Sequence, residues 1–539
     1  MATYTEYGMI RGGNTYLYGD KDARASVSEI QAELGYNNAT IAGLQIDFEN
    51  QTYTRLAGAA GKTAGTDFNT MAPFKDMKRC CVADDGTVNA YYGAAGYAED
   101  GSAGQVMVEV PKFYYKVVPL KLDIIKENIK ICPDCGQHNL NTAEICVNNA
   151  CKADLSEVAA QDFVYDGQQI RKANFYVSSQ PWEGFKVHPM FTIGGNRDKV
   201  YVGAYEGSIY DTSASEYLIG DGHPIGTTTT EISEGDTTNP ITIDEASVTA
   251  IRGDLAVYDG NSFIWTGTSW HAYTYTLDTA NDKFCSIAGV FPASGQTINL
   301  TRPNIETLCN NRGNGWHSYN TEVNYGLFLL AMIEYADPDL QLLIGQGVVN
   351  YASGTYNEAI MTGDTSALGN ASGSANLNST HPLDNVDGKR SISYRGIENF
   401  WGNIWKFVID VNFWGDGTKR GGIPYIADDF SYAESKNTGN YKQVGYSLTN
   451  AGGYISAFGY DSNFDWLLFP TEAKGNSHRP VGDYTYVSQN MGTQATPAYR
   501  IGFVGGNWYT TRTAGPCYLY ASNGVGNRSR GIGGRLLKM

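Results

Sequence analysis

The chain has 539 residues, of which 42% are hydrophobic, 12% aromatic and only 18% charged, and its formal net charge is −17. This negative charge disfavours binding to nucleic-acid phosphates, and no run of roughly 18 apolar residues is present that could insert into a membrane. The 63 glycines and 38 tyrosines favour a β-rich, turn-rich protein over a helical one.

The first hundred residues carry no recognisable motif, and we interpret residues 1–100 as a module that docks on a larger particle. Within it, residues 25–34 predict a short helix, residues 46–56 a strand and residues 58–65 a loop rich in glycine and alanine. Residues 1–20 lack the basic start and the apolar run of a secretory signal, so we expect synthesis without export.

A strand is predicted shortly after this module. Val106, Val108 and Val110 alternate with Met107 and Glu109. Because successive side chains of a strand point to opposite faces, the pattern predicts a strand with one buried face and one solvated face.

Four of the nine cysteines form the array C-x2-C-x10-C-x4-C in residues 121–162, which we interpret as an insertion. They are Cys132, Cys135, Cys146 and Cys151. Two thiolate pairs at this spacing can close a tetrahedral S4 site around Zn²⁺, and Gly136 permits the turn after the first pair. The array resembles a short zinc ribbon, which implies a structural Zn²⁺ with no open position for catalysis. Two disulfides or four free thiols are the alternatives, and His138 could replace one thiol.

Residues 210–295 predict a second insertion, a small β module. Hairpin turns are predicted at 259–260 and 267–268, where Asp-Gly and Gly-Thr separate β-forming runs. Residues 252–254 read Arg-Gly-Asp, a tripeptide that occurs often by chance, and we assign it no function.

Helices are predicted at two places in the second half of the chain. Residues 304–311 suggest a short helix, and residues 321–336 give the strongest helix in the sequence. The latter is apolar on nearly all sides, so we expect it to be buried. Further on, Trp401, Trp405 and Trp414 are predicted to anchor a core.

The segment 480–539 combines aromatic and small polar residues, with glycines where tight turns would fall. Tyrosine and tryptophan supply rigid contact area, while serine, glycine and asparagine supply adaptable hydrogen bonds, a composition typical of antibody combining sites. The alternative is that these residues form strands and turns of a β-rich core. The candidate ligand-binding residues are Tyr484, Tyr486, Asn507, Trp508, Tyr509, Thr510, Arg512, Tyr518, Tyr520, Ser522, Asn523, Asn527 and Arg528.

Four stretches of sequence resemble a known family. They are ENFWGNIWKF at 398–407, YRIGFVGGNW at 499–508, AGPCYL at 514–519 and GIGGRL at 531–536. Together they resemble the C-type lectin fold of the formylglycine-generating-enzyme type, and more narrowly the variable proteins of diversity-generating retroelements and related phage tail proteins. The resemblance implies an α+β, β-rich C-type lectin fold over residues 101–539, into which the zinc ribbon and the small β module are inserted. It also implies that residues 480–539 carry hypervariable positions on a constant scaffold.

The function implied by this resemblance is that of a phage or prophage tail receptor-binding protein, made in the host cytoplasm and located in the virion at the tail tip or fibre. Such a protein would bind a host cell-surface protein or glycan, contact other phage tail proteins and assemble as a homotrimer, without binding nucleic acid or inserting into a membrane. Two alternatives stay open: a structural tail or baseplate component without receptor binding, and a variable ligand-binding protein displayed on a bacterial surface.

Catalysis is not expected. The enzymes that share this fold need a cysteine pair in the carboxy-terminal core, where this chain has only Cys517. The tripeptides with which Ca²⁺-dependent sugar lectins hold their ion, Glu-Pro-Asn and Gln-Pro-Asp, are absent from the sequence.

The cysteines outside the array are expected to be reduced thiols that pack as small hydrophobic residues, and they are Cys80, Cys81, Cys285, Cys309 and Cys517.

Overall fold

The computed structural model describes residues 8–11, 14–17, 40–220, 222–295, 300–350, 359–375, 387–435, 437–487 and 492–539. Strands form most of the regular structure, and the α-helices of these residues are α2 (Arg302–Asn310), α3 (Thr321–Tyr335) and α4 (Leu340–Leu343). A β-rich protein with few helices is therefore confirmed. The helix predicted at 25–34 lies outside the described residues. None of the described helices combines the length and the apolar run that a membrane crossing requires.

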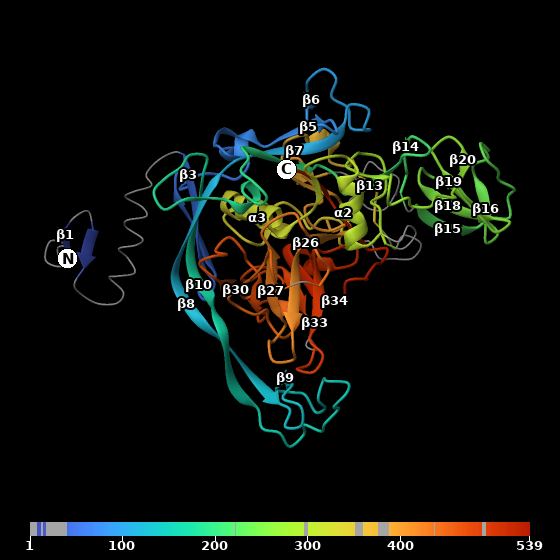
Figure 1. Ribbon diagram of the computed structural model, residues 1–539. Helices are drawn as coiled ribbons and strands as arrows, with labels where there is room; N and C mark the ends of the chain where they lie inside the picture. Colours follow the sequence, from blue (N-terminus) through green and yellow to red (C-terminus); the bar gives the residue numbers. More distant parts are fainter. Residues whose placement is uncertain are drawn as a thin grey trace.

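Three sheets build the body of the molecule (Figure 1). The first contains β3 (Ile41–Asp47), β4 (Thr52–Ala57), β8 (Tyr114–Ile131), β9 (His138–Leu140), β10 (Gln161–Ser178), β11 (Lys186–Val187), β30 (Ala457–Tyr460) and β31 (Pro470–Glu472). The second has the order β22 (Trp316–Ser318), β36 (Leu536–Lys538), β12 (Lys199–Gly203), β7 (Gln105–Pro111), β5 (Lys78–Val82) and β6 (Val88–Tyr91). The third has the order β28 (Tyr441–Gln443), β27 (Ile423–Ala427), β26 (Trp405–Gly415), β33 (Ala498–Gly505), β34 (Gly515–Asn523), β32 (Tyr484–Val487) and β29 (Gly453–Tyr454), with β35 (Ile532–Gly533) beside β26.

Smaller elements complete the described chain. The paired strands are β1 (Gly8–Arg11), β2 (Asn14–Leu17), β13 (Ser208–Asp211), β14 (Glu216–Tyr217), β21 (Lys283–Cys285), β23 (Gly373–Ser374), β24 (Ile392–Tyr394) and β25 (Ile397–Glu398). The short 3₁₀ helices are η2 (Phe68–Thr70), η3 (Phe74–Asp76), η4 (Pro189–Phe191), η5 (Ser366–Leu368) and η6 (Thr511–Thr513).

Helix α3 lies at the centre of the body (Figure 1). The Asn320 side chain caps its first turn by accepting a hydrogen bond from the backbone N of Val323 (3.0 Å). The helix ends where Ala336 takes a left-handed conformation (φ 57°). Every residue of α3 except Tyr335 is buried, and the helix packs against β3 and β10 of the first sheet and against β26 and β34 of the third. The predicted buried helix is confirmed.

Residues 46–56 do not form the single strand that the sequence predicts. Strand β3 ends at Asp47, whose carboxylate accepts a hydrogen bond from the backbone N of Asn50 (2.9 Å). This local bond closes a turn, and the chain returns as β4, which pairs with β3 in antiparallel fashion. The segment is therefore the end of one strand, a turn and a second strand.

The half-solvated strand predicted at 106–110 also needs correction. Met107 is as fully buried as Val106 and Val108, although it points to the opposite face of β7. The reason is that β7 is an inner strand, between β12 and β5, and a separate hydrophobic core covers each of its faces. The alternating side chains of this strand therefore point into two different hydrophobic cores, instead of into one core and into solvent.

A long antiparallel arm leaves the body and carries the cysteine array at its far end (Figure 1). Strands β8 and β10, of 18 residues each, pair along the arm. The loop at its end touches the third sheet again, because the backbone N of His138 donates to the carbonyl of Gly417 (3.0 Å) in the turn between β26 and β27.

The small β module stands to one side of the body (Figure 1). Its strands are β15 (His223–Thr227), β16 (Ile241–Ile243), β17 (Ala246–Val248), β18 (Asp254–Tyr258), β19 (Asn261–Trp265) and β20 (Trp270–Ala272), which enclose a core of their own. The turn at 259–260 is confirmed, with positive φ at both residues. The Asp254 carboxylate of the Arg-Gly-Asp tripeptide is buried and bonded to His223 Nδ1 (2.8 Å). The domain boundaries proposed from the sequence stay predictions.

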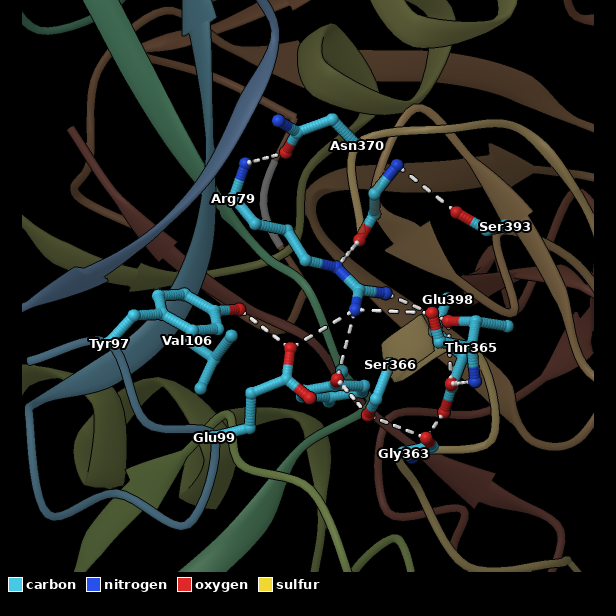
Figure 2. Close-up of polar contacts among 12 residues, drawn as sticks. Arg79, Tyr97, Glu99, Val106, Gly363, Thr365, Ser366, Asn370, Ser393 and Glu398 are labelled. Carbon is cyan, nitrogen blue, oxygen red and sulfur yellow. Dashed lines mark hydrogen bonds and ion pairs between the residues drawn. The ribbon is translucent and has the colours of Figure 1, made fainter. Parts of the chain in front are cut away.

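A buried polar network holds the start of the Trp-rich stretch (Figure 2). The fully buried Arg79 donates to the carbonyl of Gly396 (2.7 Å) and to Thr365 Oγ1 (2.8 Å). The Glu398 carboxylate accepts from the backbone N of Gly363 (2.8 Å) and from both the N and the Oγ1 of Thr365 (2.7 Å each). Buried polar groups are stable only when they are paired, so this network fixes the backbone at residue 398.

The same stretch is tied to the segments directly after β12 and directly before β36 of the second sheet. Asn403 Nδ2 donates to the Glu206 carboxylate (2.5 Å), and Lys406 Nζ lies 3.1 Å from the other oxygen of that carboxylate. Arg535, which is buried directly before β36, donates to the carbonyl of Glu398 (2.6 Å). Strand β26 therefore starts from a rigid base, and its first residue, the tryptophan at 405, belongs to the site described next.

Candidate aromatic ligand site

Side chains from five strands of the third sheet and from the segments beside them line an open hollow of about 490 Å³. We call it the aromatic hollow, and its lining residues are Trp405, Tyr486, Phe503, Tyr509, Thr510, Thr513, Tyr518, Tyr520, Asn523, Asn527, Ser529 and Ile532. Trp405 begins β26, Phe503 lies in β33, Tyr518 and Tyr520 lie in β34, and Tyr486 lies in β32. The sheet therefore gathers residues that are more than 100 positions apart in the sequence.

Aromatic rings in the hollow stack on one another in a continuous row. Tyr486 and Tyr520 are partners in the parallel pair of β32 and β34, and their ring centroids lie 4.8 Å apart at an interplanar angle of 15°. Tyr520 stacks in turn on Phe503 of the antiparallel neighbour β33 (5.1 Å, 19°). The edge-to-face contact of Trp405 with Tyr509 (5.5 Å, 85°) extends the row. Contacts of this kind hold rings in fixed orientations.

Two of these rings face solvent. Tyr486 and Tyr509 are each 47% exposed, whereas Trp405 and Tyr518 are buried beneath the surface. Large exposed aromatic side chains in one place mark binding surfaces, because isolated monomers rarely leave such area uncovered. Burial raises the pKa of Tyr518 and of Tyr520, so both phenols stay protonated at neutral pH and can donate a hydrogen bond.

The hollow also contains polar atoms without a partner. Trp405 Nε1 and Asn527 Oδ1 are buried and have no hydrogen-bond partner among the described residues. The Oγ of Ser522, which lies outside the lining, is likewise buried without a partner among the described residues. A buried donor or acceptor that stays unpaired costs on the order of 1–3 kcal/mol. A ligand that supplied partners would therefore recover free energy here.

The structure brings together seven of the residues predicted from the sequence. The predicted residues that line the aromatic hollow are Tyr486, Tyr509, Thr510, Tyr518, Tyr520, Asn523 and Asn527. Ser522 is adjacent to them in the chain, and Arg528 is exposed but outside the lining.

The other four predicted residues lie outside the lining and make internal contacts. Tyr484 is half-buried against Tyr454 (5.3 Å, edge to face). Asn507 is fully buried in a tight turn, where its backbone N donates to Thr510 Oγ1 (3.0 Å). Trp508 packs in a small buried cluster that includes residues 348, 359 and 360.

Arg512 is the fourth of these residues, and its guanidinium is occupied. It donates to both carboxylate oxygens of Asp339, at 2.8 and 3.1 Å, and to the carbonyl of Ser477 (2.8 Å). Asp339 is fully buried, so this ion pair joins the loop before β34 to the start of α4.

Five lining residues were not among the sequence predictions: Trp405, Phe503, Thr513, Ser529 and Ile532. Trp405 was expected only to anchor the core, and it is indeed buried, as is Trp401, while Trp414 is half-buried. Phe503 could have been found from the pairing of β33 with β34, because it lies directly opposite Tyr520. Thr513 and Ser529 carry no aromatic signal; Thr513 ends η6, and Ser529 lies in the loop between β34 and β35.

The cysteine array forms a second candidate site. The Sγ atoms of Cys132, Cys135, Cys146 and Cys151 all lie within 4.8 Å of one another. The nearest pairs are 3.7 Å apart, far beyond the roughly 2.05 Å of a disulfide, so the thiols are unbonded. Four converging sulfur atoms are compatible with a structural metal site.

Two details of the arm affect the ligand set. Gly136 takes a positive φ (68°), as the turn after the first cysteine pair requires. His138 is not part of the sulfur cluster, because its Nδ1 bonds to the hydroxyl of Tyr165 (2.8 Å). The cysteines outside the array are all buried and form no disulfide. Cys80, Cys309 and Cys517 pack in the hydrophobic cores as predicted, whereas Cys81 hydrogen-bonds to the carbonyl of Ala98 and Cys285 accepts from Arg312.

No protein-family model and no curated protein matches the sequence. Among solved structures, the chain is similar to one named Major Tropism Determinant P3c Variant. The two chains share 12% sequence identity with a TM-score of 0.19, and the match covers 83% of this chain and 84% of that chain. A TM-score this low does not establish a shared fold.

Proposed function

We propose that this protein is a phage or prophage tail receptor-binding protein, and that the aromatic hollow is its receptor-binding site. The observation that carries the proposal is a row of stacked aromatic rings that ends in two half-exposed tyrosines, Tyr486 and Tyr509. These tyrosines lie in the segment 480–539, which resembles the variable segment of retroelement-diversified tail proteins.

Binding would occur by surface complementarity, without bond chemistry. The base of the site is held by contacts far from the exposed tyrosines, such as that between Arg535 and the carbonyl of Glu398. Exposed side chains such as Tyr509 contribute little to those contacts, so they can change without loss of the backbone structure. Diversification by a retroelement would act on such positions, within a scaffold that we propose to be a C-type lectin fold.

The proposal has an assembly component and a metal component. Weak binding at single sites becomes strong when several copies engage one cell, so a homotrimer on the virion, held by other tail proteins, would supply avidity.

For the cysteine array we propose Zn²⁺, which would be held by Cys132, Cys135, Cys146 and Cys151. A four-sulfur site leaves no open coordination position, so the metal would cross-link the loop at the end of the arm and stabilise its structure.

Replacement of the two central tyrosines tests the proposed site. The double variant Tyr509→Ala/Tyr520→Ala should no longer adsorb to host cells but should stay folded, with its free energy of unfolding lowered by the roughly 1–3 kcal/mol that the loss of the Tyr520 ring costs. A matched control is Tyr91→Ala/Tyr92→Ala, which removes two tyrosines that are each 37% exposed but lie outside the hollow. Adsorption of the first variant at the level of the control would reject the hollow and favour a structural tail component.

A further inference from the structure

The aromatic hollow is free of charge although the whole chain carries a net charge of −17. Its lining consists only of aromatic, hydroxyl, amide and aliphatic side chains. A charged ligand would leave water for this surface without gaining an opposite charge, which is unfavourable. The lining therefore selects for an uncharged ligand.

The unpaired polar atoms of the lining narrow the chemical class of the ligand further. Trp405 Nε1 can only donate a hydrogen bond, and Asn527 Oδ1 can only accept one. A ligand that pairs with both needs a donor and an acceptor close together. Hydroxyl groups meet this need because each one both donates and accepts.

The exposed aromatic faces supply the other half of the recognition. A pyranose ring has an apolar face of C–H groups and a rim of hydroxyl groups, so it can lie on an aromatic ring while its rim bonds to polar side chains. Tyr486 and Tyr509 present such rings to solvent, and neighbouring contacts fix their orientation. The volume of about 490 Å³ lies within the usual range of small-molecule sites, roughly 300–1,000 Å³.

We propose that the aromatic hollow binds an uncharged saccharide, with a sugar ring on the exposed tyrosines and its hydroxyl groups paired with Trp405 Nε1 and Asn527 Oδ1. This inference rests on the proposed receptor-binding function and names the class of receptor that the site takes. Binding needs no metal ion and no charge, so its affinity is the same in low and high salt.

The first test is calorimetric titration of the full chain with neutral oligosaccharides and with sialylated oligosaccharides of the same length. We expect binding of at least one neutral oligosaccharide, and at least tenfold weaker binding to Trp405→Phe, which keeps an aromatic ring but removes the N–H. The matched control is Trp414→Phe, the same change in the same strand but outside the hollow, which should leave the affinity unchanged. Equal affinity of Trp405→Phe and Trp414→Phe, or binding of the sialylated oligosaccharides alone, would overturn the proposal.

The second test separates this inference from the function on which it rests. Host cells are treated either with periodate, which cleaves the vicinal diols of glycans, or with a protease, and adsorption of the protein is then measured. Loss of adsorption after periodate supports a saccharide receptor. Loss after protease alone overturns the saccharide but keeps a receptor-binding protein. Failure to adsorb to untreated cells any better than Tyr509→Ala/Tyr520→Ala rejects the proposed function itself.

Discussion

Tyr486 and Tyr520 lie opposite each other in a parallel strand pair and stack face to face, with ring centroids 4.8 Å apart. About half of the Tyr486 side chain is exposed to solvent. Tyr520 is less exposed, because its second stacking partner, Phe503, covers its other face. The two tyrosines therefore have different tasks. The outer ring presents its face to solvent, and the inner ring supports it.

This difference predicts unequal effects of single substitutions. Tyr486→Ala should change the free energy of unfolding by less than about 0.5 kcal/mol, since surface substitutions usually cost little. Tyr520→Ala should cost about 1–3 kcal/mol, because it removes stacking on two rings and leaves a gap beside Trp405. Urea unfolding of both variants measures this difference. Equal losses of unfolding free energy would show that the two rings contribute equally to stability.

Sequence variation in a natural population should follow the lining of the hollow. Deep sequencing of codons 480–539 should find substitutions at the lining positions Tyr486, Tyr509, Tyr520, Asn523 and Asn527. The buried residues Asn507 and Trp508, although they lie between the same glycines, should be constant because they hold the turn. Variation at Trp508 as frequent as at Tyr509 would contradict the assignment of the site.

Arg512 should matter for stability and not for binding. Arg512→Ala removes the cation from the buried Asp339 carboxylate and should cost roughly 2–4 kcal/mol. Arg528→Ala, a matched change at an exposed arginine of the same segment, should leave stability unchanged. Chemical unfolding measures both variants, and saccharide or cell binding per folded molecule should be equal for the two. If Arg512→Ala kept its stability but no longer bound saccharide or cells, Arg512 would be assigned to the ligand site.

Metal removal should affect the end of the arm alone. We expect about one Zn²⁺ per chain by elemental analysis, and loss of this ion in Cys146→Ser. Without it, hydrogen exchange of residues 132–155 should accelerate, while α3 keeps its protection. Cys81→Ser is the control, because Cys81 is a buried thiol outside the array. Full metal content in Cys146→Ser would refute a four-sulfur site.

The pair of Glu472 and Arg171 should make stability depend on pH in the acid range. Burial alone would raise the pKa of the Glu472 carboxyl, but the hydrogen bonds and charge of Arg171 (2.8 Å) outweigh it and lower this pKa from 4.5 to about 2. Since the pKa is lowered by folding, the stabilisation is complete above pH 4.5 and disappears as the pH falls towards 2.

Glu472→Gln should therefore lower the free energy of unfolding by about 1–3 kcal/mol at neutral pH and have little effect near pH 2. Unfolding in urea across this pH range measures the difference. Glu49→Gln is the matched control, because Glu49 forms an exposed ion pair with Lys121 and its replacement should cost less than about 1 kcal/mol. A constant difference between Glu472→Gln and the unchanged protein at all pH values would argue against the lowered pKa.

Local patterns in the sequence predicted several features of this structure. The apolar residues of 321–336 predict α3, the cysteine spacing predicts the sulfur cluster, and the dense tyrosines of 480–539 predict most of the polar and aromatic lining of the hollow. Each of these features depends on residues that are near one another in the sequence or share one chemical property.

Features that depend on distant partners were not predicted. Arg512 looks like a ligand-binding residue until its partner Asp339, which is 173 positions away, is known. Asn507 and Trp508 have the composition of a binding loop, but packing against residues near 348 buries Trp508. Trp405 looked like a core residue, and it is buried. Nothing in the sequence distinguishes a buried core tryptophan from a buried tryptophan that also lines a hollow.

Strand β36 can complete the second sheet only after nearly the whole chain has been synthesised. This strand pairs with β12 on one side and with β22 on the other, and Leu536 and Leu537 are fully buried. Strand β12 ends at Gly203 and β36 begins at Leu536, so the ribosome adds roughly 330 residues between them, which takes about 15–60 s at ordinary rates of translation. During that time the nascent chain exposes a strand edge that can aggregate. Every sequence variant of this chain would share that delay and the same exposure to aggregation.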